Sequence, residues 1–210
     1  AKRGKIFTKV IKEITVAARI GGGDVDGNPR LRLAVQKAKE VNMPQENVTR
    51  AIKKGTGELE GVQYQEISYE GYGPGGVAIF MEVMTDNKNR TISELRAVLD
   101  KNGGNMGENG CVAWIFEKKG TITIMTPEKD EEELLELVMD AGGDDLQTVD
   151  DHYEITTSIE TFESVRKAIE NSGIKAQSAE LTRIPQNMVN VEEKNCKSLL
   201  RLMDMLEDHD

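Results

Sequence analysis

The chain is poor in the side chains from which catalytic and metal sites are usually built. It contains two histidines, His152 and His209, which are too few for a histidine-based metal cluster. Its two cysteines, Cys111 and Cys196, lie far apart in the sequence and outside any CxxC motif. We therefore expect two reduced thiols, as in a cytoplasmic protein, and no metal site.

Aromatic side chains and long apolar segments are also scarce. Only 4% of the 210 residues are aromatic, so we expect small aliphatic cores and several modest domains. No apolar run is long enough to cross a membrane, and the cationic start lacks the apolar segment of a signal peptide. These features predict a cytoplasmic protein without a membrane partner.

Familiar catalytic motifs are missing as well. The sequence has no P-loop, no GxSxG elbow, no HExxH pair and no cysteine–histidine set with zinc spacing. Carboxylates are common, but the spacing of Asp86, Glu94 and Asp100, for example, indicates no catalytic pair. We predict that the protein is not an enzyme and needs no cofactor, and no residue pattern identifies a small-molecule substrate.

What the sequence does have is a basic segment at its start, residues 1–56. This segment has thirteen basic and five acidic side chains, a net charge of +8; the whole chain has −10, so residues 57–210 carry −18. A basic segment on an acidic body typically binds a polyanion. The basic residues are Lys2, Arg3, Lys5, Lys9, Lys12, Arg19, Arg30, Arg32, Lys37, Lys39, Arg50, Lys53 and Lys54.

Residues 2–20 are expected to form an amphipathic helix with a basic stripe opposite an apolar one. A solvated cationic face is the alternative interpretation. We favour binding, because like charges one helical turn apart repel by roughly a few tenths of a kcal/mol each and we expect no carboxylate of the same molecule to neutralise them. The apolar arc contains Phe7, Val10, Ile11, Ile14, Ala17 and Ala18. The predicted nucleic-acid-binding residues are Lys2, Arg3, Lys5, Lys9, Lys12, Arg19, Lys53 and Lys54.

Two further helices complete a predicted three-helix bundle, residues 1–57. Asn28 is expected to cap the second helix, with Pro29 at its first position. The third helix follows Pro44 and is expected to stop at Gly55. The short joints between these helices favour a compact helical domain.

A middle α+β domain is predicted for residues 58–118 plus 186–210. Strands are expected at 64–69, 76–84 and 112–116, with helices at 91–101 and 192–207. The turn at 71–76 formally contains GxGxxG, but a strand follows it where a dinucleotide site needs a helix, so we reject that site. The glycine-rich loop 103–110 either orders on a partner or supplies positive φ angles.

A ferredoxin-like βαββαβ domain is predicted between these parts, at residues 119–185. The fold class is therefore multidomain α+β, with a helical bundle followed by two α/β domains. Acidic residues crowd the start of the helix expected after Pro127, where interaction with the helix dipole explains them without a metal. They are Glu128, Asp130, Glu131, Glu132 and Glu133.

A polar loop at residues 85–91 is the second candidate contact surface. Asn87, Lys88, Asn89 and Arg90 could donate to phosphates or base edges. The alternative is a capped loop, with Asn89 or Thr91 capping the helix that follows.

Five motifs, in order along nearly the whole chain, resemble the YebC family. They are AKRGKIFTKVIKEI, NMPQENVTRAIKKGTG, YEGYGPGGVAI, TDNKNRT and GGNMGENGCVAWIF. The family is described as probable transcriptional regulators and includes the mitochondrial translational activator of cytochrome c oxidase. The resemblance implies three domains and no known catalysis. Members usually have a further short basic segment before the stretch matching Ala1, and one more strand after the last helix.

The resemblance implies a nucleic-acid-binding regulator, and three versions of this role are open. The first is a DNA-binding transcriptional regulator that uses the helical domain. The second is a ribosome-associated translation factor that binds rRNA through the same domain. The third is an adaptor whose basic stripe binds an acidic protein. In the first two, a protein partner could also bind the acidic domains.

Overall fold

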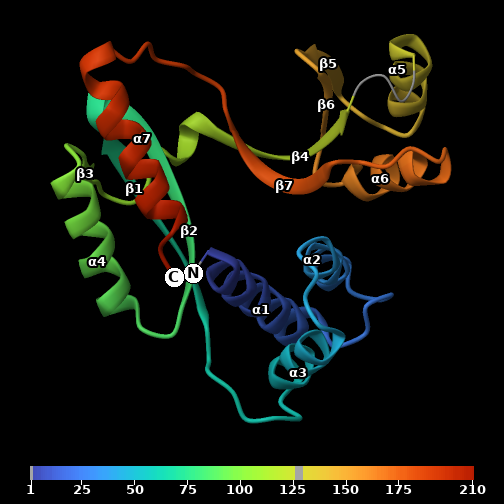
Figure 1. The fold of residues 1–210 in the computed structure, drawn as a ribbon, viewed down its shortest axis with the longest axis horizontal. Coiled ribbons are helices and arrows are strands. Elements are labelled where there is room, and N and C mark those ends of the chain that lie inside the picture. Colours follow the sequence, from blue (N-terminus) through green and yellow to red (C-terminus); the bar gives the residue numbers. More distant parts are fainter. Residues whose placement is uncertain (1, 126–129) are drawn as a thin grey trace. The chain divides into compact units, whose positions relative to one another are not determined.

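The computed structural model describes residues 2–125 and 130–210. The chain divides into two compact units, Ala1–Ala113 with Val189–Asp210, and Trp114–Met188. The described residues form an N-terminal helical part and two antiparallel sheets with helices packed on them (Figure 1). This architecture confirms the predicted fold class.

Three helices open the first unit: α1 (Lys2–Gly21), α2 (Pro29–Glu40) and α3 (Gln45–Thr56). The first of them packs against both of the others. Their core is aliphatic, as expected from the scarcity of aromatic residues, because the apolar positions recur with helical spacing. It contains Val10, Ile14, Ala17, Ala18, Leu31, Ala34, Val35, Ala38, Met43, Val48 and Ala51.

Asn28 ties the start of α2 to the end of α1. Its side-chain oxygen accepts a hydrogen bond from the Leu31 amide at 3.1 Å, which confirms the predicted N-cap. Its amide nitrogen also donates to the carbonyl oxygens of Ala17 and Gly22, each at 2.8 Å. Asn28 is only 5% exposed, so these three hydrogen bonds have no competition from bulk water.

The prediction that α3 stops at Gly55 is wrong. The helix continues to Thr56, and Gly57 ends it with a φ of 84°. Gly55 is instead a point of close helix packing. A Cβ there would meet the Thr15 carbonyl oxygen and lie 2.8 Å from the Ala18 Cβ, so only glycine lets α3 approach α1 this closely.

The sheet of the first unit has the order β2-β1-β3. Its strands are β1 (Gln65–Gly73), β2 (Val77–Thr85) and β3 (Asn105–Met106), and its helices are α4 (Lys88–Lys101) and α7 (Glu193–Glu207). A strand, not a helix, follows the glycine-rich turn, which agrees with rejecting a dinucleotide site. The core beneath the helices contains Tyr69, Ile79, Met81, Leu95, Leu99 and Leu202.

The strand predicted at 112–116 is wrong. Val112 is in no regular element, Ala113–Ile115 form a short 3-10 helix, and Phe116 already begins the next strand. The third strand is β3, inside the glycine-rich loop. Residues 110–113 do not pair as a strand because their amides bind a side chain instead. The buried carboxylate of Glu70 accepts hydrogen bonds from the amides of Gly110, Val112 and Ala113 at 2.5, 3.0 and 2.5 Å.

The glycine-rich loop therefore has partners within the first unit. Gly103 and Gly110 have φ angles of 78° and 90°, as the second interpretation of this loop expected. The amide of Gly107 donates to the main-chain oxygen of Glu70 at 2.8 Å. One glutamate thus holds the loop from both its main chain and its side chain.

The second unit has the predicted βαββαβ order. Its elements are β4 (Phe116–Met125), α5 (Glu131–Asp140), β5 (Asp145–Val149), β6 (His152–Thr157), α6 (Phe162–Asn171) and β7 (Ser178–Pro185). The sheet order β5-β6-β4-β7, antiparallel throughout, is that of a split βαβ fold. Ile122, Ile124 and Ile155 are fully buried and alternate with less buried neighbours, so one face forms the core. The predicted helix start at Pro127 and the acid Glu128 lie outside the described residues.

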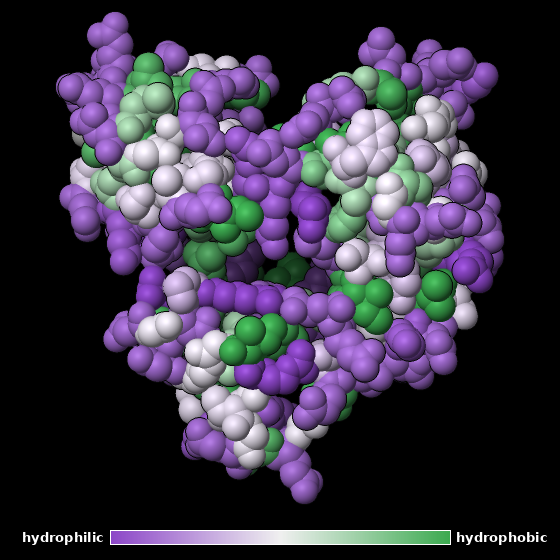
Figure 2. Space-filling model, turned by 180° about the vertical axis from the view of Figure 1, so that it is seen from behind, coloured by the Kyte–Doolittle hydropathy of each residue, from purple (hydrophilic) through white to green (hydrophobic). Residues whose placement is uncertain are grey.

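Figure 2 shows one face of the molecule, on which hydrophilic side chains predominate and apolar groups form small separate patches. Among the helices of the described residues, none is both long enough and apolar enough to span a bilayer.

We predict that Asn28→Ala lowers the free energy of unfolding by about 1–3 kcal/mol, because it removes a helix cap and the two hydrogen bonds that Asn28 donates to the Ala17 and Gly22 carbonyl oxygens. Urea unfolding measures the change, with the exposed Asn190→Ala as the matched control. Asn28→Asp keeps the acceptor but loses both donors, so it should remain destabilised. A stability of Asn28→Asp equal to that of the unsubstituted protein would contradict this assignment.

Candidate nucleic-acid interface

The basic stripe of α1 is only partly open to solvent. Lys2, Arg3 and Lys5 are exposed, whereas Lys9 and Lys12 are half-buried. The guanidinium of Arg3 lies 5.3 Å from the centre of the Phe7 ring. The side chains therefore share one helix, as predicted, but differ in their environments.

Three lysines of this stripe contact the C-terminal end of α7. The Lys5 and Lys12 ammonium groups donate to the main-chain oxygens of Asp208 and Asp210 at 2.7 and 2.6 Å. Lys9 donates to the main-chain oxygen of Glu207, whose carboxylate lies 4.0 Å from the Lys9 nitrogen. The expectation that no carboxylate of the same molecule neutralises the stripe is wrong for Lys9, whereas Lys5 and Lys12 donate to main-chain oxygens.

The end of a helix explains the contacts of Lys9 with Glu207 and of Lys5 with Asp208, the C-cap of α7; Asp210, the partner of Lys12, lies just beyond the helix. The last carbonyl groups of a helix have no intrahelical donors, and the helix dipole places partial negative charge at this end. Lys5, Lys9 and Lys12 are spaced by four and three residues, so they form one row on α1. The row meets acceptors that lie about two hundred residues away in sequence, which local periodicity cannot reveal.

Lys12 also links the basic stripe of α1 to the second candidate surface, the 85–91 loop. Its nitrogen lies 5.5 Å from the centre of the Tyr64 ring. Burial lowers the pKa of the Lys12 ammonium, while the negative charges of Asp210 and Asp86 oppose this and the positive charge of Arg90 adds to it. Burial likewise raises the pKa of the Tyr64 hydroxyl, and Asp86 raises it further. The start of α1 and the 85–91 loop thus act on each other electrostatically.

Two arginines connect the helical part to the start of the sheet. Arg19 donates to the main-chain oxygen of Tyr64 at 2.6 Å. Arg30 binds Glu13 through two hydrogen bonds, at 2.7 and 3.2 Å, and Glu66 through two more, at 2.5 and 3.3 Å. These hydrogen bonds raise the pKa of Arg30 above its ordinary value, so its charge is held in place. Sequence analysis counted Arg30 as part of the basic segment and missed this role.

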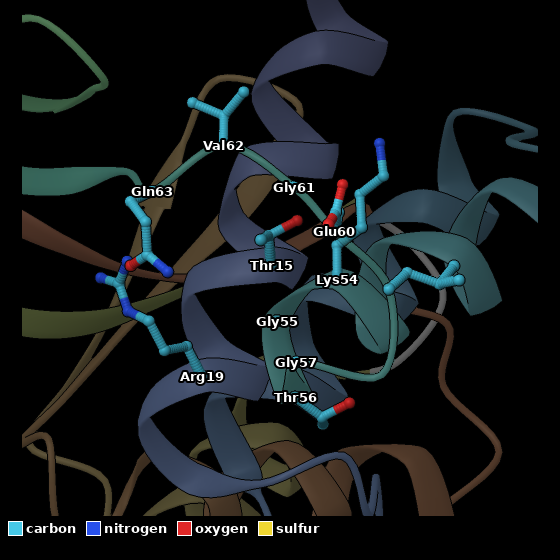
Figure 3. Close-up of a pocket in the computed structure, with 11 residues that line it drawn as sticks. Thr15, Arg19, Lys54, Gly55, Thr56, Gly57, Glu60, Gly61, Val62 and Gln63 are labelled. Carbon is cyan, nitrogen blue, oxygen red and sulfur yellow. The ribbon is translucent and has the colours of Figure 1, made fainter.

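Lys53 and Lys54 lie in the last turn of α3, away from these contacts. Among residues 2–125 and 130–210, no side-chain hydrogen bond or ion pair engages Lys2, Lys39, Lys53 or Lys54. A cavity of 590 Å³ beside α3 is lined by Arg19 and Lys54. Figure 3 shows the Arg19 and Lys54 side chains pointing apart, so the two cations do not converge on one ligand in this cavity.

The 85–91 loop is a capped loop in part, but the predicted capping residues are wrong. Asn87 is the N-cap of α4 and accepts from the Arg90 amide at 3.0 Å. Thr91 is buried and shares a 2.8 Å hydrogen bond with Thr85. The guanidinium of Arg90 donates to Asp86 at 2.8 Å. Lys88 and Asn89 remain exposed and could contact a ligand.

Comparison with known sequences decides the family. Residues 1–58 match the TACO1/YebC protein N-terminal domain, and residues 64–210 match the TACO1/YebC second and third domain. The chain belongs to the TACO1/YebC family. This confirms the resemblance that the five sequence motifs indicate.

Relatives in this family are closely similar over the whole chain. Probable transcriptional regulatory proteins of Geobacter sulfurreducens and Syntrophobacter fumaroxidans are 59% identical over 210 residues and 58% identical over 211 residues. Each match covers 100% of this chain and 85% of the relative. The crystal structure of a conserved hypothetical protein from Aquifex aeolicus is 46% identical, with a TM-score of 0.90, and the match covers 100% of this chain and 86% of that one.

No group of three or more His, Cys, Asp or Glu side chains in the described part of this TACO1/YebC chain is arranged to hold a metal ion. The candidate interface consists of lysine and arginine side chains and the main-chain carbonyl groups and carboxylates that bind them.

We predict that Arg30→Lys lowers the free energy of unfolding by about 1 kcal/mol, because a lysine cannot form two bidentate pairs. Urea is the appropriate denaturant, since guanidinium chloride would screen the pairs. Arg50→Lys, at an exposed pair with Glu46, is the control and should change stability by no more than a few tenths of a kcal/mol. Equal effects of the two substitutions would contradict the role assigned to Arg30.

Proposed function

We propose that the chain is a nucleic-acid-binding regulator of gene expression that catalyses no reaction, and that it regulates transcription by binding DNA through its helical part. The observation that carries this proposal is the set of cations that the described residues leave unpaired on that part, Lys2, Lys39, Lys53 and Lys54. The rest of the chain is strongly acidic, so phosphate contact is favoured at this surface alone. The names of the relatives support a role in transcription.

A second function, rRNA binding in translation, is favoured by the start of α2. DNA-reading helices usually present polar side chains to base edges near their N-terminus. Here Asn28 is buried as the cap and Arg30 is engaged by Glu13 and Glu66. Contact through phosphates alone positions a protein without reading sequence, and it serves a structured RNA as well as a duplex.

We predict that Lys53→Glu with Lys54→Glu weakens binding to a mixed-sequence DNA duplex and reduces the salt slope. On duplex DNA each lost phosphate contact removes about 0.9 from the slope of log K against log salt, so two should remove about 2. On single-stranded RNA the value is about 0.7 per contact. Fluorescence anisotropy over a range of salt concentrations measures both.

The control for this pair is Lys167→Glu with Lys175→Glu, which makes the same charge change at exposed positions of the second unit. Unchanged affinity in the Lys53 and Lys54 pair would remove these lysines from the interface. Co-sedimentation with ribosomes separates the two functions: loss of ribosome binding in the variant supports translation, whereas a sharp footprint at one DNA sequence supports transcription.

A further inference from the structure

We propose that the C-terminal end of α7 is an intramolecular competitor of nucleic acid, which occupies Lys5, Lys9 and Lys12 until a phosphate backbone displaces it. This inference rests on the proposed function, because it describes how the same basic surface is regulated. In this closed state the end of α7 is bound to Lys5, Lys9 and Lys12. Lys53 and Lys54 remain available for the first contact with nucleic acid.

The chemistry of the end of α7 resembles that of a phosphate backbone. Within residues 207–210 it offers three main-chain oxygens and the carboxylates of Glu207 and Asp210 to one row of ammonium groups. Lysine nitrogens bind phosphate oxygens with the same donors that they use for carbonyl oxygens and carboxylates. An ammonium group that donates to α7 is therefore less available to a phosphate at the same time.

The contact between α1 and α7 is polar, so breaking it exposes little apolar surface. The core of the helical part and the core beneath α4 and α7 are separate clusters with no residue in common. A groove of 270 Å³ lies at the contact. It is lined by Lys9, Lys12 and Asp210 and also by apolar side chains such as Met81, Met203 and Leu206, which border an open space instead of packing closely against α1. Separation therefore forfeits hydrogen bonds that water or phosphate can replace, and little hydrophobic energy.

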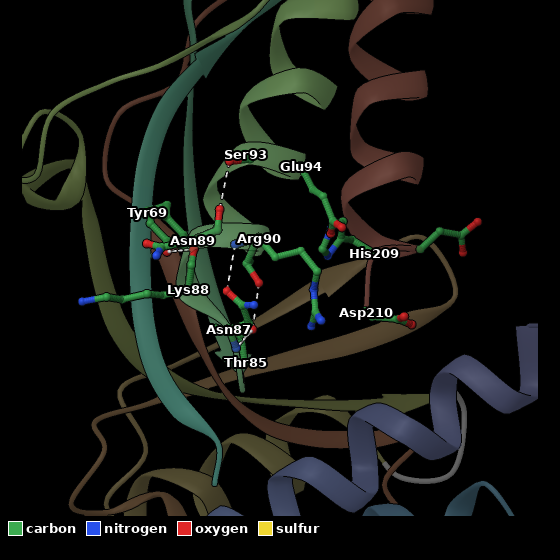
Figure 4. Close-up of polar contacts among 12 residues, drawn as sticks. Tyr69, Thr85, Asn87, Lys88, Asn89, Arg90, Ser93, Glu94, His209 and Asp210 are labelled. Carbon is green, nitrogen blue, oxygen red and sulfur yellow. Dashed lines mark hydrogen bonds and ion pairs between the residues drawn. The ribbon is translucent and has the colours of Figure 1, made fainter. Parts of the chain in front are cut away.

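The connection between the two parts permits such a separation. Residues 58–64, between the end of α3 and the start of β1, contain no helix or strand, and Gly57 and Gly61 lie in or beside them. Other contacts across this joint include Arg19 with the Tyr64 carbonyl, Arg30 with Glu66, and the Lys12 ammonium with the Tyr64 ring. Figure 4 shows His209 and Asp210 at the end of α7, where His209 bonds to Glu94 of α4 at 2.8 Å, so α7 itself stays fixed to its own domain.

A closed state lowers the apparent affinity in proportion to the fraction of molecules that are open. Neutralising the end of α7 should therefore raise affinity without adding any new contact. The direct test is Glu207→Gln with Asp210→Asn in the full chain, probed with a mixed-sequence DNA duplex and a single-stranded RNA. We expect about threefold to tenfold tighter binding, since exposed ion pairs are individually weak.

The matched control is Glu136→Gln with Asp140→Asn, which makes the same chemical changes at exposed positions of α5. It corrects for the general effect of two fewer negative charges. Thermal unfolding of both variants checks that they fold. Equal affinities of the α7 variant and the control would overturn the proposal, and a clear excess in the α7 variant supports it.

A second measurement needs no nucleic acid. An amine-reactive reagent read by mass spectrometry should modify Lys5 and Lys9 more slowly than Lys53 and Lys54, and the difference should shrink in the α7 variant. If no variant binds either nucleic acid, the proposed function fails while the labelling still tests the contact. If nucleic acid binds and the labelling rates of the two lysine groups are equal, the competitor is disproved and the proposed function stands.

Discussion

The paired binding of Arg30 to two carboxylates is the interaction on which the arrangement of the basic surface depends. The residue starts α2, and its guanidinium holds Glu13 of α1 on one side and Glu66 of β1 on the other. Because Glu13 directly follows Lys12, this double pair helps to fix which side of α1 faces the sheet. The same rotation of α1 brings its lysine row to the end of α7. Arg30 therefore contributes to how much of the basic segment remains open, together with Arg19 and the lysines of α1.

The positive charges of the helical part have two roles, and the net charge of the whole chain reveals neither of them. Part of the positive charge of the helical part serves internal structure: Arg19 and Arg30 join it to the sheet, and three lysines of α1 meet the end of α7. The remainder includes Lys2, Lys39, Lys53 and Lys54, whose side chains make no hydrogen bond or ion pair among the described residues and face water. The internal contacts are half-buried or exposed, so salt screens them in part and a ligand with higher charge density can compete with them.

Local patterns predicted the fold well. Helical spacing of apolar residues located the three N-terminal helices, and the Asn-Pro pair located the start of α2, because capping depends on neighbours three residues away. The order βαββαβ followed from the alternation of strand-like and helix-like spacing of apolar residues along the sequence. Two local predictions were wrong for non-local reasons: Gly55 serves packing between α3 and α1, and the segment before Phe116 follows the carboxylate of Glu70. A third error was local, because Asn87 rather than Asn89 or Thr91 caps α4.

The sequence by itself determined the elements, the family and the concentration of positive charge at the start of the chain, since each of these is encoded by residues close together. It also placed the lysine row on one side of one helix. Only the tertiary structure decided what that row touches, because its acceptors are main-chain oxygens at residues 207, 208 and 210, and a carbonyl group is present at every position of every sequence. Which carbonyl groups are left unpaired near a lysine depends on where helices end and how they pack, and residue types alone do not carry that information.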